Sequence, residues 1–135
     1  MVDNTSMRSP ALQLEGTAST PTVDFDSQTG CLHLRGVSMP ENVLVFYRPI
    51  LQWIRDYSRH PAEATCMRFD LLYFNTASSK LLLELFSILE DMHEAGRRVE
   101  VEWLYREEDL DMEEAGEDFS NLLQLPFRMV RKPND

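Results

Sequence analysis

The sequence predicts an α/β fold: a single domain whose mixed central sheet of about four to six strands packs with about three helices. Segments with the two-residue alternation of strands follow one another in turn with segments whose apolar residues recur at helical spacing. That order builds a mostly parallel sheet. The chain also opens with a hairpin pattern, which adds antiparallel strands. We expect the domain at residues 11–132, after a flexible, polar N-terminal tail at residues 1–10.

The hairpin is predicted from two alternating runs, residues 22–26 and residues 31–35, which are joined by turn-forming residues ending in Gly30. A shorter strand is expected before it, near Leu12 and Leu14.

An amphipathic helix is predicted next. Ser38 and Glu41 have capping-box spacing with Pro40 in the first turn, so we expect the helix to start there. Pro49 removes an N–H donor from its interior, which predicts a kink or two shorter helices. The apolar stripe of this helix consists of Val43, Phe46, Tyr47, Ile50, Ile54 and Tyr57.

The segment 65–74 is predicted to be a central strand. It is apolar on nearly both faces, which is typical of a strand covered on both sides. Its alternation assigns one face to Met67, Phe69, Leu71 and Tyr73, and the other to Arg68, Asp70, Leu72 and Phe74.

The rest of the chain continues the succession of helices and strands. A helix at residues 81–95 is expected to end at Gly96, in the position after the cap that favours glycine. Residues 99–105 form the clearest strand, a helix is expected from about Asp111, and residues 127–131 form a last short strand.

Composition excludes several classes of protein. The 135 residues are 43% hydrophobic and 27% charged, as in an ordinary globular domain, and the net charge is −10. This acidity argues against nucleic acid and against an anionic membrane surface as partners. Residues 1–16 lack a secretory pattern, and no apolar run approaches the roughly 18 residues of a membrane span, so we expect a cytoplasmic protein.

No cofactor or metal site is expected. Cys31 and Cys66 are interpreted as small buried apolar residues in a reducing compartment. His33, His60 and His93 are scattered without metal-ligand spacing, and no glycine-rich phosphate loop is present. The acidic residues 107–118 are interpreted as a solvated helix face, or as a docking surface for a basic partner.

The junction between the central strand and the second helix is the candidate functional site. Asn75 or Thr76 is placed to cap the helix, whose free N–H groups and dipole favour an anion. A phosphate on Thr76 adds nearly two negative charges there, and Lys80, four residues later, lies on the same helix face. Ser78 and Ser79 support the helix start. On spacing alone, simple capping of the helix by Asn, Thr and Ser is the better explanation, and a phosphorylation site is the alternative.

Three separated segments resemble the SiaC family of regulatory phosphoproteins: YFNTASSK (73–80), VEWLY (101–105) and DLDMEEAGEDF (109–119). Residues 16–21 and 40–42 also fit, so the resemblance covers nearly the whole domain. The family is similar to bacterial anti-anti-sigma proteins of STAS fold, and the resemblance therefore implies a STAS-like domain.

The same resemblance implies a partner-switching signalling protein rather than an enzyme. By this resemblance, a cognate kinase is expected to phosphorylate Thr76, and a metal-dependent serine/threonine phosphatase to remove the phosphate. The unphosphorylated protein is expected to bind and activate a diguanylate cyclase, which raises cyclic di-GMP and promotes biofilm formation. Ala77 departs from the family pattern, which often has serine there, but leaves Thr76 untouched.

Three other functions stay open at this point. One is a constitutive STAS-type module that binds a nucleotide or lipid. Another is an anti-anti-sigma factor that acts on transcription. The third is a small hydrolase that uses Asp70 or the acidic helix.

Overall fold

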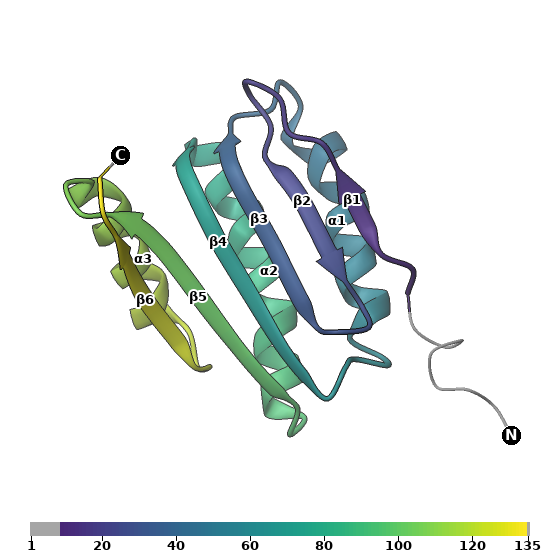
Figure 1. Cartoon of the computed structure of the whole chain (residues 1–135). Coiled ribbons are helices and arrows are strands. Elements are labelled where there is room, and N and C mark those ends of the chain that lie inside the picture. The colour runs from purple at the N-terminus through teal and green to yellow at the C-terminus, as the bar shows by residue number, and fades with distance from the viewer. Residues whose placement is uncertain (1–8, 135) are drawn as a thin grey trace, which may run out of the picture.

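The computed structural model describes residues 9–134. This part of the chain forms one six-stranded mixed sheet and three helices (Figure 1), so the predicted fold class is confirmed, while the STAS-like label stays a prediction. Most of the expected tail, residues 1–8, lies outside the described residues. Among residues 9–134, no helix is long and apolar enough to cross a membrane. In chain order the elements are β1 (Leu12–Leu14), β2 (Thr22–Asp26), β3 (Cys31–Ser38), α1 (Val43–Tyr57), β4 (Ala64–Phe74), α2 (Thr76–Glu94), β5 (Arg98–Arg106), α3 (Leu110–Leu122) and β6 (Phe127–Lys132).

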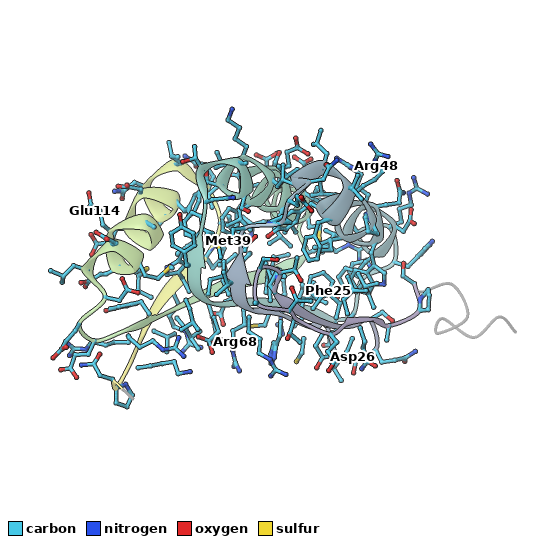
Figure 2. The ribbon with its side chains drawn as sticks, turned by 90° about the horizontal axis from the view of Figure 1, so that it is seen from above. Phe25, Asp26, Met39, Arg48, Arg68 and Glu114 are labelled. Carbon is cyan, nitrogen blue, oxygen red and sulfur yellow. The ribbon has the colours of Figure 1, made fainter. Side chains whose placement is uncertain are left out.

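The strands lie in the sheet in the same order as in the chain, β1 to β6. β1, β2 and β3 are antiparallel, as the hairpin pattern predicts, and Gly30 takes the positive φ of 77° that the turn requires. β3 to β6 are parallel neighbours. Because parallel crossovers are right-handed and each one steps in the same direction, all three helices lie on one face of the sheet (Figure 2).

The opposite face, which we call the open face, has no covering helix in residues 9–134. Arg68 lies on it, away from the helices (Figure 2). The prediction that β4 is covered on both sides is therefore wrong. The apolar end of β4 suggested burial, but the open face of its middle carries half-buried polar side chains, Cys66, Arg68 and Asp70.

The core lies between the sheet and the helices. Met67 and Phe69 of β4 and Trp103 of β5 are fully buried in it. Gly116 lets α3 approach this layer, because a Cβ atom at that position would lie 2.4 Å from Cδ1 of Trp103. The indole Nε1 of Trp103 donates a hydrogen bond to the Met112 carbonyl at 3.0 Å. Trp103 thereby fixes α3 against the sheet.

Helix α1 differs from its prediction at two points. It begins at Val43 rather than near Ser38, because Asn42 is the N-cap and its Oδ1 accepts the N–H of Val45 at 3.1 Å. It also runs unbroken through Pro49, so the alternative of two shorter helices is wrong. Val45 and Pro49 are both exposed, which allows water to satisfy the carbonyl that lost its donor.

Helix α2 ends as predicted. Gly96 has φ of 89° directly after the cap, and its N–H donates to the His93 carbonyl at 3.0 Å. The N–H of Arg97 donates to the Met92 carbonyl at 3.0 Å, which completes the paired bonds of a Schellman motif.

Candidate functional site

The predicted junction lies where β4 ends and α2 begins, at the carboxyl edge of the parallel strands. Asn75 is the N-cap of α2, and its Oδ1 accepts the N–H of Ser78 at 2.8 Å. The backbone N–H of Asn75 donates to the Ser38 carbonyl at the end of β3, at 3.0 Å. Of the two predicted capping residues, Asn75 therefore caps the helix, and the hydroxyl of Thr76 is not used as the cap.

Thr76 is the first residue of α2, and its side chain is exposed. The N–H groups of Thr76 and Ala77 lie in the first turn of α2, which has no preceding helical carbonyls to accept them. Free N–H donors and the helix dipole favour an anion at this position. Lys80 is exposed one turn further on. A kinase requires access to the hydroxyl that it modifies, and the position of Thr76 provides it.

Ser78 differs from Thr76 because it is fully buried. Its Oγ donates to the Ser38 carbonyl at 3.0 Å and accepts from the Ser38 Oγ at 2.9 Å. The Ser38 Oγ and the Tyr47 hydroxyl lie 2.6 Å apart, and burial raises the pKa of Tyr47 to about 12, so this hydroxyl stays protonated. Ser78 thus holds α2 against β3 and α1 and is closed to modification. Ser79 is half-buried, and its Oγ donates to the Thr76 carbonyl at 2.7 Å.

A register shift shapes the end of β4. Gly36 of β3 is opposite Leu71, but Val37 is opposite Tyr73, so Leu72 is an extra residue in β4. The shift reverses the alternation: Tyr73 is 51% exposed, whereas Phe74 turns inward. The predicted faces of Tyr73 and Phe74 are therefore wrong. Gly36, a glycine inside a strand pattern with φ of 113°, is the sequence signal that could have indicated this bulge.

β4 and β5 separate beyond the pair Phe69 and Trp103, the last residues in register between them. In the space that this leaves, Phe74 packs on Trp103 and Phe119, with ring centroids 5.9 and 6.1 Å apart. A pocket of about 350 Å³ opens between the end of β4 and the start of α3. It is lined by Leu72, Tyr73, Phe74, Asp109, Asp111, Met112 and Ala115.

Large apolar side chains are exposed around Thr76. Within residues 9–134, eight such side chains are exposed, and six of them end a parallel strand, follow one or begin the next helix at this edge. Patches of exposed apolar side chains mark interaction sites, and these six residues share one edge of the sheet. We call these six residues the apolar edge: Met39, Leu44, Val45, Leu72, Tyr73 and Leu110.

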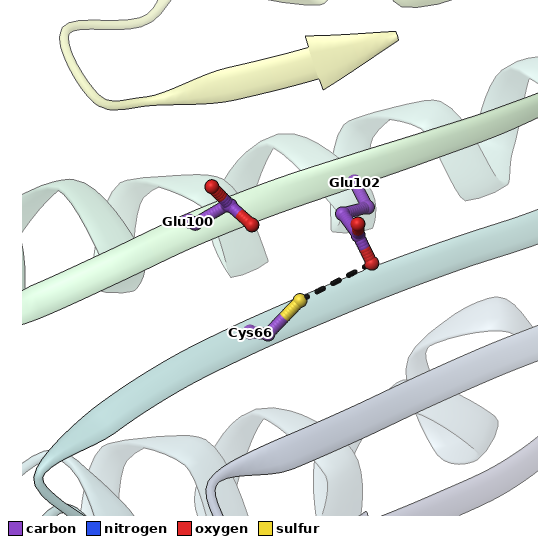
Figure 3. Close-up of side chains that lie close together, drawn as sticks. All are labelled: Cys66, Glu100 and Glu102. Carbon is purple, nitrogen blue, oxygen red and sulfur yellow. Dashed lines mark hydrogen bonds between the residues drawn. The ribbon is translucent and has the colours of Figure 1, made fainter. Parts of the chain in front are cut away.

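A second cluster lies on the open face. Cys66 of β4 and Glu100 and Glu102 of β5 offer ligand atoms within 4.8 Å of one another (Figure 3). However, Arg68 Nε donates to Glu102 Oε1 at 3.0 Å, and Arg128 forms ion pairs with both glutamates. Burial and the charge of Glu100 raise the pKa of the Cys66 thiol, which keeps it a protonated donor to Glu102 at 3.4 Å. These contacts describe an ion-pair network rather than a metal site.

Asp70 belongs to the same face. Burial alone would raise the pKa of its carboxyl, but the hydrogen bonds and charges of Lys132 and Arg106, at 3.1 and 2.7 Å, outweigh burial and lower it. A carboxylate held ionised in this way is poorly suited to donate protons. The ion pairs therefore argue against Asp70 as a general acid, one role that the hydrolase hypothesis could give it.

Known proteins with the same features were found by sequence and by structure. The family model for SiaC family regulatory phosphoproteins matches residues 14–132. An uncharacterized protein of Pseudomonas aeruginosa (strain UCBPP-PA14) is 31% identical over 116 residues, which are 86% of this chain and 92% of that protein.

Two solved structures share the fold. Apo-SiaC from Pseudomonas aeruginosa has a TM-score of 0.83 and 30% identity, and the match covers 90% of this chain and 99% of that one. The complex of the diguanylate cyclase SiaD with its activator SiaC, from the same organism, gives a TM-score of 0.86 at 30% identity, with the same coverage. The chain therefore belongs to the SiaC family of regulatory phosphoproteins.

Proposed function

We propose that this protein is a non-enzymatic, cytoplasmic switch that binds and activates a diguanylate cyclase until Thr76 is phosphorylated. The observation that carries the proposal is the exposed Thr76 side chain at the start of α2, beside the apolar edge. A relative with 30% identity is an activator in complex with a diguanylate cyclase, which supports this class of partner.

In the unmodified protein, the apolar edge supplies the contact area. Burying apolar side chains against a partner is favourable by roughly 25 cal/mol per Å² removed from water. Tyr73 and Leu72 are suited to be anchors because both are about half exposed and stand next to the pocket between β4 and α3.

Phosphorylation of Thr76 puts nearly two negative charges beside this surface. A partner that covers the phosphate must strip its water, and an unpaired buried charge costs several kcal/mol. A loss of 1.4 kcal/mol in binding free energy weakens affinity about tenfold. A single phosphate is therefore sufficient to weaken partner binding by at least this factor. In the free protein, the first-turn N–H groups and Lys80 stabilise the phosphate, so the modification leaves the fold intact.

The proposed switch needs two further partners, a cognate protein kinase that phosphorylates Thr76 and a metal-dependent phosphatase that reverses it. The burial of Ser78 and the exposure of Thr76 favour Thr76 as the acceptor within the motif.

The test is phosphorylation by the cognate kinase, with the site mapped by mass spectrometry. We expect one phosphate on the wild-type protein and none on Thr76→Ala, because the variant lacks the exposed hydroxyl that accepts the phosphate. Ser79→Ala is the matched control and should be labelled as fully as the wild type. Full labelling of Thr76→Ala with its circular dichroism unchanged would overturn the assignment.

A further inference from the structure

The two cysteines of the chain face each other across neighbouring strands. Cys31 in β3 and Cys66 in β4 are partners in the parallel register. Their sequence neighbours Leu32 and Met67 are fully buried on the helix side, so both thiols lie on the open face. The expectation that both cysteines are buried core residues is therefore wrong.

The strand pairing sets a separation that a disulfide accepts. Neighbouring strands lie about 4.8 Å apart, and disulfides join Cα atoms at about 4.4 to 6.8 Å. The pairing is held by the backbone, since the Cys66 N–H donates to the Gly30 carbonyl at 2.8 Å. Gly30 itself cannot be replaced without strain, because an added Cβ would lie 2.0 Å from the Ala64 carbonyl oxygen.

The two thiols differ in access. Cys31 is exposed, whereas Cys66 is half-buried and donates to Glu102. Burial and the charge of Glu100 raise the pKa of Cys66, which makes Cys31 the thiol that an incoming oxidant meets first. Cys66 then stands beside it as the resolving thiol.

We propose that Cys31 and Cys66 form a reversible cross-strand disulfide when the protein meets a low-molecular-weight disulfide such as oxidised glutathione. The Cys31 thiolate attacks one sulfur of glutathione disulfide, and its S–S bond breaks and releases one glutathione thiolate. Cys66 then leaves its hydrogen bond to Glu102 and gives up its proton, and its thiolate attacks the Cys31 sulfur and releases the second glutathione. The two protein thiols lose two electrons and two protons, and the glutathione disulfide is reduced to two thiols.

The bond would close the segment from Cys31 to Cys66, which contains β3, α1 and the start of β4. Cross-linking restricts the unfolded chain, so the oxidised protein should be the more stable form. Thr76 lies after the other end of β4, and the proposal does not depend on phosphorylation or on the cyclase.

The experiment uses the full-length protein in glutathione buffers of increasing oxidation, followed by maleimide alkylation and intact mass measurement without reductant. The expected product is a monomer that has lost the mass of two hydrogen atoms, takes up no maleimide, and regains both thiols with dithiothreitol. Its Tm should exceed that of the reduced protein. Persistence of both thiols, or a disulfide between two chains, would overturn the proposal.

Two variants test the order of the steps. Cys66→Ser should stop at a stable mixed disulfide between Cys31 and glutathione. Cys31→Ser should react at least tenfold more slowly than the wild type, because the remaining thiol is half-buried. A wild-type protein that accumulates the mixed disulfide without resolving it would show that the two sulfurs cannot meet.

Discussion

The apolar edge and the open face are two surfaces built on the same sheet, and they differ in the side chains that they present to solvent. On the open face, Asp70 pairs with Arg106 and Lys132, and Glu102 pairs with Arg68 and Arg128. At the apolar edge, large apolar side chains stand in solvent instead. The charged side chains of the open face are paired within the chain, whereas the apolar side chains of the apolar edge leave water only when another molecule covers them. A binding surface is therefore expected at the edge rather than on the broad face.

The largest effect that this comparison predicts is at Tyr73. Tyr73→Ala removes a half-exposed aromatic side chain from the proposed docking surface, so affinity for the cyclase should fall by about 2 kcal/mol, roughly 30-fold. Leu122→Ala is the matched control, because Leu122 is 67% exposed at the other end of α3. Calorimetric titration of both variants checks this. Equal losses for the two would remove the distinction between the edge and the rest of the surface.

The next effect concerns the open face and should change stability alone. Glu102→Gln takes away the charge of a carboxylate that is 5% exposed and paired with two arginines, so the free energy of unfolding should fall by about 1–2 kcal/mol. Glu100→Gln, whose side chain is 47% exposed and 3.8 Å from Arg128, should change stability by less than about 0.5 kcal/mol. Urea unfolding measures both. If Glu102→Gln folds but binds the cyclase more weakly than the wild type, the open face is part of the docking surface and the comparison fails.

The smallest predicted effect is the pH dependence contributed by Asp70. Its pKa is lower in the folded protein than in the unfolded chain, so the unfolded chain takes up the proton first as the pH falls. The carboxylate therefore stabilises the fold at neutral pH and loses this contribution below about pH 4, near the ordinary pKa of aspartate. The stability advantage over Asp70→Asn, about 1 kcal/mol at pH 7 for a partly exposed ion pair, should shrink with acidification. An advantage that grows on acidification would contradict the ion pairs.

Sequence patterns predicted the parts of this molecule that depend on local spacing. The hairpin at Gly30, the helix end at Gly96 and the capped junction at Asn75 each rest on a few adjacent residues, and each is found where it was expected. The N-cap of α1 at Asn42 is equally local, but the competing spacing of Ser38 conceals it.

The misassigned features depend on contacts between distant residues. Ser38 bonds to Ser78, forty positions away, and no spacing rule connects the two. The bulge that exposes Tyr73 arises from the pairing of β4 with β3 rather than from β4 itself. Alternation likewise places Arg68 on a face but cannot tell whether a helix covers that face. Local spacing likewise makes Thr76 a candidate, whereas the apolar side chains of the apolar edge come from β4, α1, α3 and one loop, and only the fold brings them to the same edge.

The central claim is that a phosphate on Thr76 determines whether a diguanylate cyclase can dock. It is tested most directly by the affinity of the cyclase for the unmodified protein and for the same protein phosphorylated at Thr76, measured side by side by calorimetry. We predict that phosphorylation weakens binding at least tenfold, about 1.4 kcal/mol, without changing the fold. Equal affinity of the two forms would contradict the account.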